Sequence, residues 1–379
     1  MTLHKSLLLL CLPIIACSEG GVTYDNCRYD DQGDLCLKDS LIIELPTSVS
    51  AHPDYISLYK EDHNEYILFL SDEGDSIYSY DLTNNLSLGL TKIPSSIPLT
   101  QGFCILNDRQ IYYNYHSGQL SIIRDNRESF IMAAPPDTKV DQFNPYPFAS
   151  TIAPIKYYAG NIIMSGFRVG ESRLEKRRPR YSICIVDEDR NSINVLIEFP
   201  DIYKKGNWGG GFTYRQPFFD IGDKGQIVVS FSASDAIIEY SMNTGHTRSV
   251  EVGSKYINTI KPFSTSKRRL PDSHEEIVWY RNNPAYQAII YDSYSHLYYR
   301  FVTLPEQNNV RQYSGYSRKK LSVIVLDESL NRLCETPLPD DIIFRPDCVF
   351  VSSYGLSIQV FSESEDEIKF YNYVYRNKT

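Results

Sequence analysis

The chain lacks the sequence motifs of the common metal and hydrolytic sites. It contains eight cysteines and seven histidines, but no Cys-x-x-Cys pair and no cysteine–histidine cluster, which are the patterns of structural zinc sites. The Gly-x-Ser-x-Gly and His-Glu-x-x-His signatures are also absent. The sequence therefore predicts no cofactor and no metal, and it offers no motif for an enzyme.

Positive charge and long hydrophobic runs are scarce as well. Lys and Arg number 38 against 47 Asp and Glu, which gives a net charge of −9. A nucleic-acid-binding protein needs a basic face, so the sequence predicts no nucleic-acid partner. After the N-terminal segment, no apolar run approaches the roughly 20 residues that a membrane-spanning helix needs.

The first 17 residues have the layout of a bacterial secretion signal. Lys5 precedes an apolar run over residues 7–15, and the small Ala16 precedes Cys17, as at a cleavage site. The ending Ile-Ile-Ala-Cys resembles a lipobox, whose cysteine becomes the acylated N-terminus. We expect a lipid anchor at Cys17 that holds the chain at the cell envelope, on the periplasmic or surface side of the outer membrane. The alternative is an ordinary signal peptide with an incidental cysteine.

Strand-forming residues dominate the remainder of the chain. Thirty tyrosines are unusual, and aromatic residues favour strands, so the fold class predicted is all-β. A strand, a polar turn and a second strand recur, for example in SIYSYDLTNNLSLGLTKIP and in YSICIVDEDRNSINVLIEFP. Another hairpin candidate precedes most of these pairs. Units of four strands that repeat along a chain predict a β-propeller.

Six such units can be counted. The last unit supplies only three strands, and DSLIIELP, residues 39–46, has the pattern of the missing fourth one. The N-terminal strand would then close the ring and protect an open edge. A seven-bladed count would treat residues 254–283 as a blade, but these read better as an insertion. The predicted units are residues 54–97, 98–140, 146–203, 212–253, 284–339 and 340–376.

The predicted domain organisation follows from this count. Residues 1–16 form the signal peptide, residues 17–38 a tether, and residues 39–379 a single propeller domain. Cys27 and Cys36 lie close together in the tether, where an exported protein can oxidise them to a disulfide. Three other cysteines sit in strand-like patterns and are expected to behave as small buried hydrophobic residues. They are Cys104, Cys184 and Cys334.

The lipobox and the units IIYDSYSHLYYRFV and SVIVLDESLNRLCETPLP resemble an uncharacterised family of Bacteroides-type propeller lipoproteins, known only as a domain of unknown function. The resemblance covers most of the mature chain. It implies a TolB-like six-bladed propeller at the cell envelope. It carries no catalytic or binding residue.

Candidate binding residues come from the loops between the predicted blades. Arginine offers a fixed fork for carboxylates and phosphates, and aromatic rings offer flat apolar faces. Such residues would suit an anion or a sugar at the end of the central channel. The alternative is that they hydrogen-bond neighbouring blades and plug the channel. The candidates are His52, Trp208, Tyr214, Arg215 and Arg345.

Two loops are basic although the protein is acidic. If both border the same end of the ring, they would create a local positive field that attracts anions. The alternative is two independent solvated loops. The residues of the first loop include Arg173, Arg177, Arg178 and Arg180, and those of the second include Lys267, Arg268 and Arg269.

The function predicted from these observations is a lipid-anchored binding or interaction module of the cell envelope. Its partner would be a glycan, an anionic ligand, a peptide or another envelope protein. The rival hypothesis is a polysaccharide-acting hydrolase or lyase with His52, Tyr214 and Arg215 at the funnel. General acid–base catalysis needs a tuned pair of groups, and only one loop histidine is well placed. A third hypothesis is a scaffold with a plugged channel.

Overall fold

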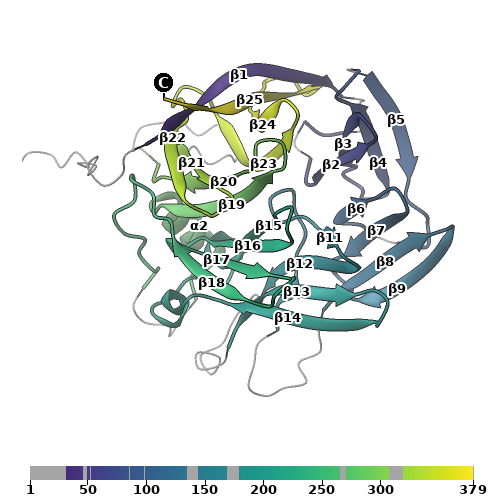
Figure 1. Cartoon of the computed structure of the whole chain (residues 1–379), viewed down its shortest axis with the longest axis horizontal. Coiled ribbons are helices and arrows are strands. Elements are labelled where there is room, and N and C mark those ends of the chain that lie inside the picture. Colours follow the sequence, from purple (N-terminus) through teal and green to yellow (C-terminus); the bar gives the residue numbers. More distant parts are fainter. Residues whose placement is uncertain are drawn as a thin grey trace, which may run out of the picture.

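In the computed structural model, six antiparallel sheets are arranged as the blades of a ring around a common axis (Figure 1). The first strand of each blade lies nearest the axis and the fourth lies at the rim. The structure describes residues 31–45, 49–51, 53–84, 86–97, 99–134, 144–168, 179–264, 270–306 and 319–378.

Blades 1 to 3 follow one another along the chain, and blade 3 has a divided inner strand. Its two short pieces, β10 and β11, both pair with β12. The strands of blade 1 are β2 (Ile56–Glu61), β3 (Asn64–Leu70), β4 (Ser76–Asp81) and β5 (Leu86–Lys92); those of blade 2 are β6 (Gly102–Ile105), β7 (Arg109–Asn114), β8 (Gln119–Arg124) and β9 (Arg127–Met132); those of blade 3 are β10 (Tyr146–Pro147), β11 (Lys156–Tyr158), β12 (Asn161–Phe167), β13 (Tyr181–Asp187) and β14 (Ser192–Glu198).

Blades 4 to 6 complete the ring, and two short helical segments and one longer helix accompany them. The helical segments are η3 (Asp201–Lys204), α1 (Phe212–Arg215) and α2 (Ser273–Arg281). The strands of blade 4 are β15 (Pro217–Ile221), β16 (Gln226–Phe231), β17 (Ala236–Ser241) and β18 (Thr247–Glu251); those of blade 5 are β19 (Ala285–Asp292), β20 (Leu297–Thr303), β21 (Leu321–Asp327) and β22 (Arg332–Pro337); those of blade 6 are β23 (Phe344–Ser352), β24 (Gly355–Val360), β25 (Glu367–Asn377) and β1 (Gly33–Glu44).

The burial pattern of a strand depends on the position of that strand in its blade. The middle strand β16, with the sequence QIVVSF, is buried at five of its six residues, because neighbouring blades cover both of its faces. The rim strand β18, with the sequence TRSVE, alternates between exposed and half-buried residues, because only one of its faces packs on another blade. This difference explains why the inner hairpins are the more hydrophobic ones.

The predicted closure of the ring by the N-terminal strand is confirmed. Strand β1 pairs with β25 from Gly33 opposite Asn377 to Glu44 opposite Glu367, and the purple β1 lies along the yellow β25 in Figure 1. The strand begins at Gly33 rather than at residue 39, so part of the predicted tether belongs to blade 6. The pairing continues through a bulge near Leu37, which the sequence pattern does not reveal.

The prediction of six blades is also confirmed, and residues 254–283 form no blade. Their described part contains α2, whose N-terminus is held by a capping box between Asp272 and Glu275. Among the predicted buried cysteines, Cys184 and Cys334 are buried, whereas Cys104 is half-buried. Cys27 lies outside the described residues, so its predicted disulfide with Cys36 is not described. Within the described parts of the chain, no helix has the length and apolarity needed to cross a membrane.

Candidate functional site

The predicted aromatic candidates are part of the core. The Trp208 side chain is 1% exposed, and its indole N–H donates to the carbonyl oxygens of Ile202 and Lys205. The Tyr214 side chain is completely buried, and its hydroxyl donates to the Pro284 carbonyl at 2.9 Å. Both rings therefore stabilise the connections around blade 4 and present no face to a ligand.

Arg215 is buried beside them. Its Nε donates to the Gly209 carbonyl at 2.7 Å. The neighbouring carboxylate of Glu276, from α2, accepts hydrogen bonds from the Gly211 amide and the Thr213 hydroxyl. A Cβ added at Gly209 would lie 2.8 Å from a Glu276 carboxylate oxygen, so the glycines of the GNWGGG segment make room for this buried carboxylate. The segment is built for packing against α2.

Of the other predicted residues, the structure describes Arg345 and Arg180. Arg345 lies in β23 and forms an ion pair with Asp347 at 2.6 Å. Arg180 is buried and donates to the Tyr203 carbonyl. His52 and the lipidation candidate Cys17 lie outside the described residues, as do the basic-loop residues Arg173, Arg177, Arg178, Lys267, Arg268 and Arg269.

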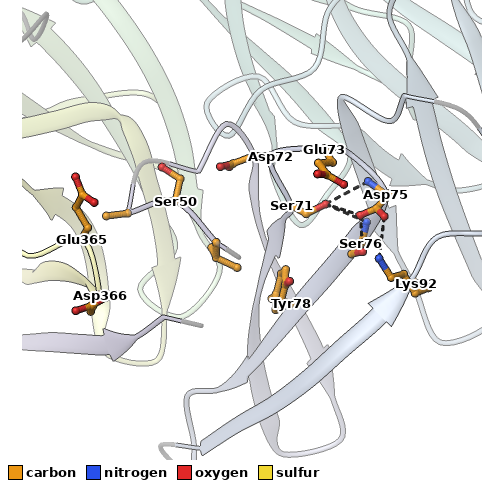
Figure 2. Close-up of a pocket in the computed structure, with 12 residues that line it drawn as sticks. Ser50, Ser71, Asp72, Glu73, Asp75, Ser76, Tyr78, Lys92, Glu365 and Asp366 are labelled. Atoms are coloured by element: carbon orange, nitrogen blue, oxygen red, sulfur yellow. Dashed lines mark hydrogen bonds and ion pairs between the residues drawn. The ribbon is translucent and has the colours of Figure 1, made fainter. Parts of the chain in front are cut away.

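A pocket of about 610 Å³ lies between blade 6 and blade 1. It is lined by the β1–β2 connection, the β3–β4 turn and the β24–β25 turn, together with residues of β4 and β5. Figure 2 shows Glu365 and Asp366 on one side and the group around Asp75 on the other, with Ser50 between them. The lining residues are Val49, Ser50, Ala51, Ser71, Asp72, Glu73, Asp75, Ser76, Tyr78, Lys92, Glu365 and Asp366.

The charge of this acidic pocket is strongly one-sided. Five of its lining side chains are carboxylates and one is a lysine. That lysine, Lys92, forms an ion pair with Asp75 at 2.8 Å. Its ammonium, together with the hydroxyl of Ser76, lowers the pKa of the Asp75 carboxyl to about 2. The remaining four carboxylates thus set the potential of the pocket, which attracts cations and repels anions.

Hydrogen bonds and a glycine hold the backbone of the β3–β4 turn. The Ser71 hydroxyl accepts hydrogen bonds from the Asp75 and Ser76 amides and donates to the Asp75 carboxylate. Gly74 has a φ of +65°, and a Cβ there would lie 2.5 Å from the Thr100 carbonyl oxygen. Asp72 and Glu73 between these points are exposed. The turn therefore presents two solvated carboxylates on a fixed backbone.

The central channel is a second cavity, with a volume of about 320 Å³. Inner residues of all six blades line it, and most of them are apolar. Its main charged feature is an ion pair between Lys156 and Asp220 at 2.7 Å. None of Trp208, Tyr214, Arg215 and Arg345 lines the channel or the acidic pocket.

Sequence reasoning missed the acidic pocket although a signal for it exists. The segments SDEGDS, residues 71–76, and SESEDE, residues 362–367, are turns that carry three and four carboxylates in six residues. They are separated by almost the whole chain, and only closure of the ring brings blade 6 next to blade 1. The arginine and aromatic residues of the loops are more unusual in the sequence, but Trp208, Tyr214 and Arg215 are buried and serve packing.

Comparison with known proteins supports the fold. The model of a family described as a domain of unknown function, DUF4221, matches residues 33–337. Among curated proteins, none matches this chain. The chain is similar to the crystal structure of a DUF4221 family member from Bacteroides vulgatus, with 20% identity, a TM-score of 0.73, and coverage of 92% of this chain and 100% of that one.

Two further structures are more distant. One is a putative exported protein from Bacteroides fragilis, with 10% identity, a TM-score of 0.52, and coverage of 91% of this chain and 96% of that one. The other is a virginiamycin B lyase from Staphylococcus aureus, with 12% identity, a TM-score of 0.44, and coverage of 90% and 100%. The first of these likenesses concerns the fold alone, and the second supports no conclusion about this chain.

Proposed function

We propose that this chain, which belongs to the DUF4221 family of unknown function, is a lipid-anchored binding module of the cell envelope. The acidic pocket is its binding site, and the ligand is a segment of a partner envelope protein that carries lysine or arginine side chains. The single observation that carries the proposal is the concentration of five carboxylates around one cavity.

Several features of the acidic pocket suit such a ligand. Its volume of about 610 Å³ lies within the range of pockets that hold small ligands or a few side chains. The exposed carboxylates of Asp72, Glu73 and Glu365 can form charge-assisted hydrogen bonds with guanidinium or ammonium groups. The half-buried ring of Tyr78 adds an aromatic face, on which cations also bind. A neutral glycan would use the same hydroxyls and ring but would gain nothing from the charge.

The first prediction concerns this charge. A labelled oligolysine peptide should bind the soluble domain, and an oligoglutamate peptide should not. Replacement of Asp72, Glu73, Glu365 and Asp366 by their amides should weaken oligolysine binding by at least roughly tenfold, because four contacts of a few tenths of a kcal/mol each add to about 1.4 kcal/mol. Fluorescence anisotropy at low and physiological salt measures both affinities.

A matched control changes the same number of charges elsewhere. The exposed carboxylates Asp125, Asp189, Glu198 and Glu251 lie outside the acidic pocket, and their amide variants lose the same net charge. The control should retain most of the affinity. If both variants lose the same affinity, binding follows net charge alone, and the acidic pocket is not the site.

The second prediction concerns the anchor. Cys17→Ser should abolish incorporation of an alkyne-labelled fatty acid, because the acylated thiol is removed. Cys11→Ser should leave labelling unchanged, because Cys11 lies in the segment expected to be cleaved. Equal labelling of Cys17→Ser and the unmodified protein would contradict a lipid anchor at Cys17.

A further inference from the structure

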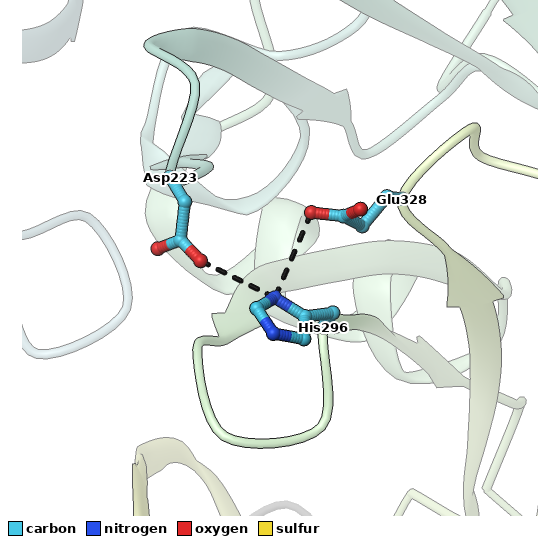
Figure 3. Close-up of side chains that lie close together, drawn as sticks. All are labelled: Asp223, His296 and Glu328. Carbon is cyan, nitrogen blue, oxygen red and sulfur yellow. Dashed lines mark ion pairs between the residues drawn. The ribbon is translucent and has the colours of Figure 1, made fainter.

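A second cluster of side chains lies on blades 4 and 5, away from the acidic pocket. Asp223 comes from the β15–β16 turn, His296 from the β19–β20 turn and Glu328 from the β21–β22 turn. One ligand atom of each lies within 4.8 Å of the other two. Figure 3 shows the three side chains directed toward one another from three separate turns.

Tyr291, at the end of β19, supplies a fourth donor atom. Its hydroxyl oxygen lies 2.9 Å from Asp223 Oδ2, 3.1 Å from His296 Nδ1 and 3.2 Å from Glu328 Oε1. His296 Nδ1 in turn lies 3.3 Å from Asp223 Oδ2 and 3.7 Å from Glu328 Oε1. Five of the six distances among the four atoms are therefore between 2.9 and 3.7 Å.

The five short distances are compatible with a tetrahedral metal site. Zinc binds nitrogen and oxygen ligands at about 2.1 Å, so neighbouring ligand atoms in a tetrahedron lie about 3.4 Å apart. We propose that Asp223, His296, Glu328 and Tyr291 form a binding site for a zinc-like divalent transition metal ion. Imidazole nitrogen and carboxylate oxygen are both ligands that zinc accepts.

The cluster places two carboxylates around a single hydroxyl hydrogen. The Tyr291 hydroxyl has one hydrogen, yet its oxygen lies within hydrogen-bond distance of both Asp223 and Glu328. At any moment the hydroxyl donates to one carboxylate, and the other can accept a hydrogen bond only from His296 Nδ1 or from water. A cation at the centre of the four atoms would interact favourably with all of them. It would also stabilise the phenolate form of Tyr291 by its charge.

The surroundings hold the four groups in place and leave access from solvent. The Tyr291 ring packs against the Tyr298 ring, with centroids 4.8 Å apart. Lys224 binds the outer oxygen of Glu328 at 3.2 Å, which leaves Oε1 directed into the cluster. The side chains of His296 and Asp223 are 58% and 46% exposed, so an ion can enter without movement of the backbone.

The test uses the soluble domain, freed of metal by a chelator, and Zn²⁺ alone. We expect saturable binding of one ion per chain, with release of protons and an ultraviolet difference spectrum of tyrosinate. His296→Ala and Tyr291→Phe should each weaken binding by roughly 100-fold or more, since even changes behind the ligands cost about 10- to 100-fold. The exposed His246, in the β17–β18 turn, provides the control: His246→Ala should bind normally.

Loss of metal binding is informative only if the variants fold. Tyr291→Phe retains the aromatic packing, and His296 is largely exposed, so both variants should fold, and circular dichroism checks this. If His296→Ala and Tyr291→Phe bind Zn²⁺ as well as the unmodified protein does, the proposed site is wrong. It is also wrong if the unmodified protein shows no saturable binding of Zn²⁺. Zinc binding without the tyrosinate signal would remove Tyr291 from the ligand set.

Discussion

Deletion of residues 33–44 should prevent the protein from folding. These residues form β1, which pairs with β25 along its whole length and buries Leu35 and Ile43 at 4% and 1% exposure. Without them, β25 becomes an open edge with a row of unpaired backbone groups, which invites aggregation. The deleted chain should appear in inclusion bodies or lack a cooperative melting transition, as measured by soluble yield and circular dichroism.

Two point variants test whether the buried side chains of β1 stabilise the fold. Ile43→Ala should lower the free energy of unfolding by about 2–4 kcal/mol, because Ile43 is buried in the contact between blades 6 and 1. Leu37→Ser should change it by about 0.5 kcal/mol or less, because Leu37 is 52% exposed. A stable, soluble deletion variant would show that the ring closes in another way.

The second large effect is expected at Arg300, in β20 of blade 5. The residue is completely buried, and its guanidinium lies 3.7 Å from the centroid of the Tyr286 ring. Burial lowers its pKa to about 10. It donates four hydrogen bonds to blade 4 and the segment that follows it, with acceptors Ser230 Oγ and the carbonyl oxygens of Ser234, Asp235 and Val252.

Arg300→Ala should lower the free energy of unfolding by about 3–5 kcal/mol, because it leaves several buried acceptors unpaired and a cavity between the blades. Arg248→Ala is the control: this arginine pairs with Glu239 at the surface, is 40% exposed, and should cost about 1 kcal/mol or less. Chemical denaturation measures both. Equal losses would contradict the view that Arg300 links blades 4 and 5.

The fold was largely predictable because its signal is local. Each hairpin carries its own alternation and turn residues, and six repeats reinforce one another, so the number of blades and the N-terminal closure were correct. The starting point of β1 was not predicted correctly, because the apolar run in residues 33–38 is only three residues long, from Leu35 to Leu37, and is too short to indicate a strand by itself. Their pairing depends on β25, which lies more than three hundred residues further along the chain.

The sites were less predictable because their residues meet only through the fold. Trp208 and Arg215 looked like ligand contacts in an unusual loop, but whether such side chains face solvent or α2 depends on a helix some 60 residues away. The acidic pocket joins two turns from opposite ends of the chain. The cluster around His296 uses four residues at spacings that match no linear motif.

The central claim, that the acidic pocket binds a basic segment of an envelope partner, is tested most directly by site-specific photo-cross-linking in intact cells. A photoreactive residue at position 365, in the acidic pocket, should capture a partner, and the captured peptide should be rich in lysine and arginine. The same residue at position 251, on the rim strand β18 of blade 4, should not capture it. Equal capture from both positions, or an acidic captured peptide at position 365, would contradict the account.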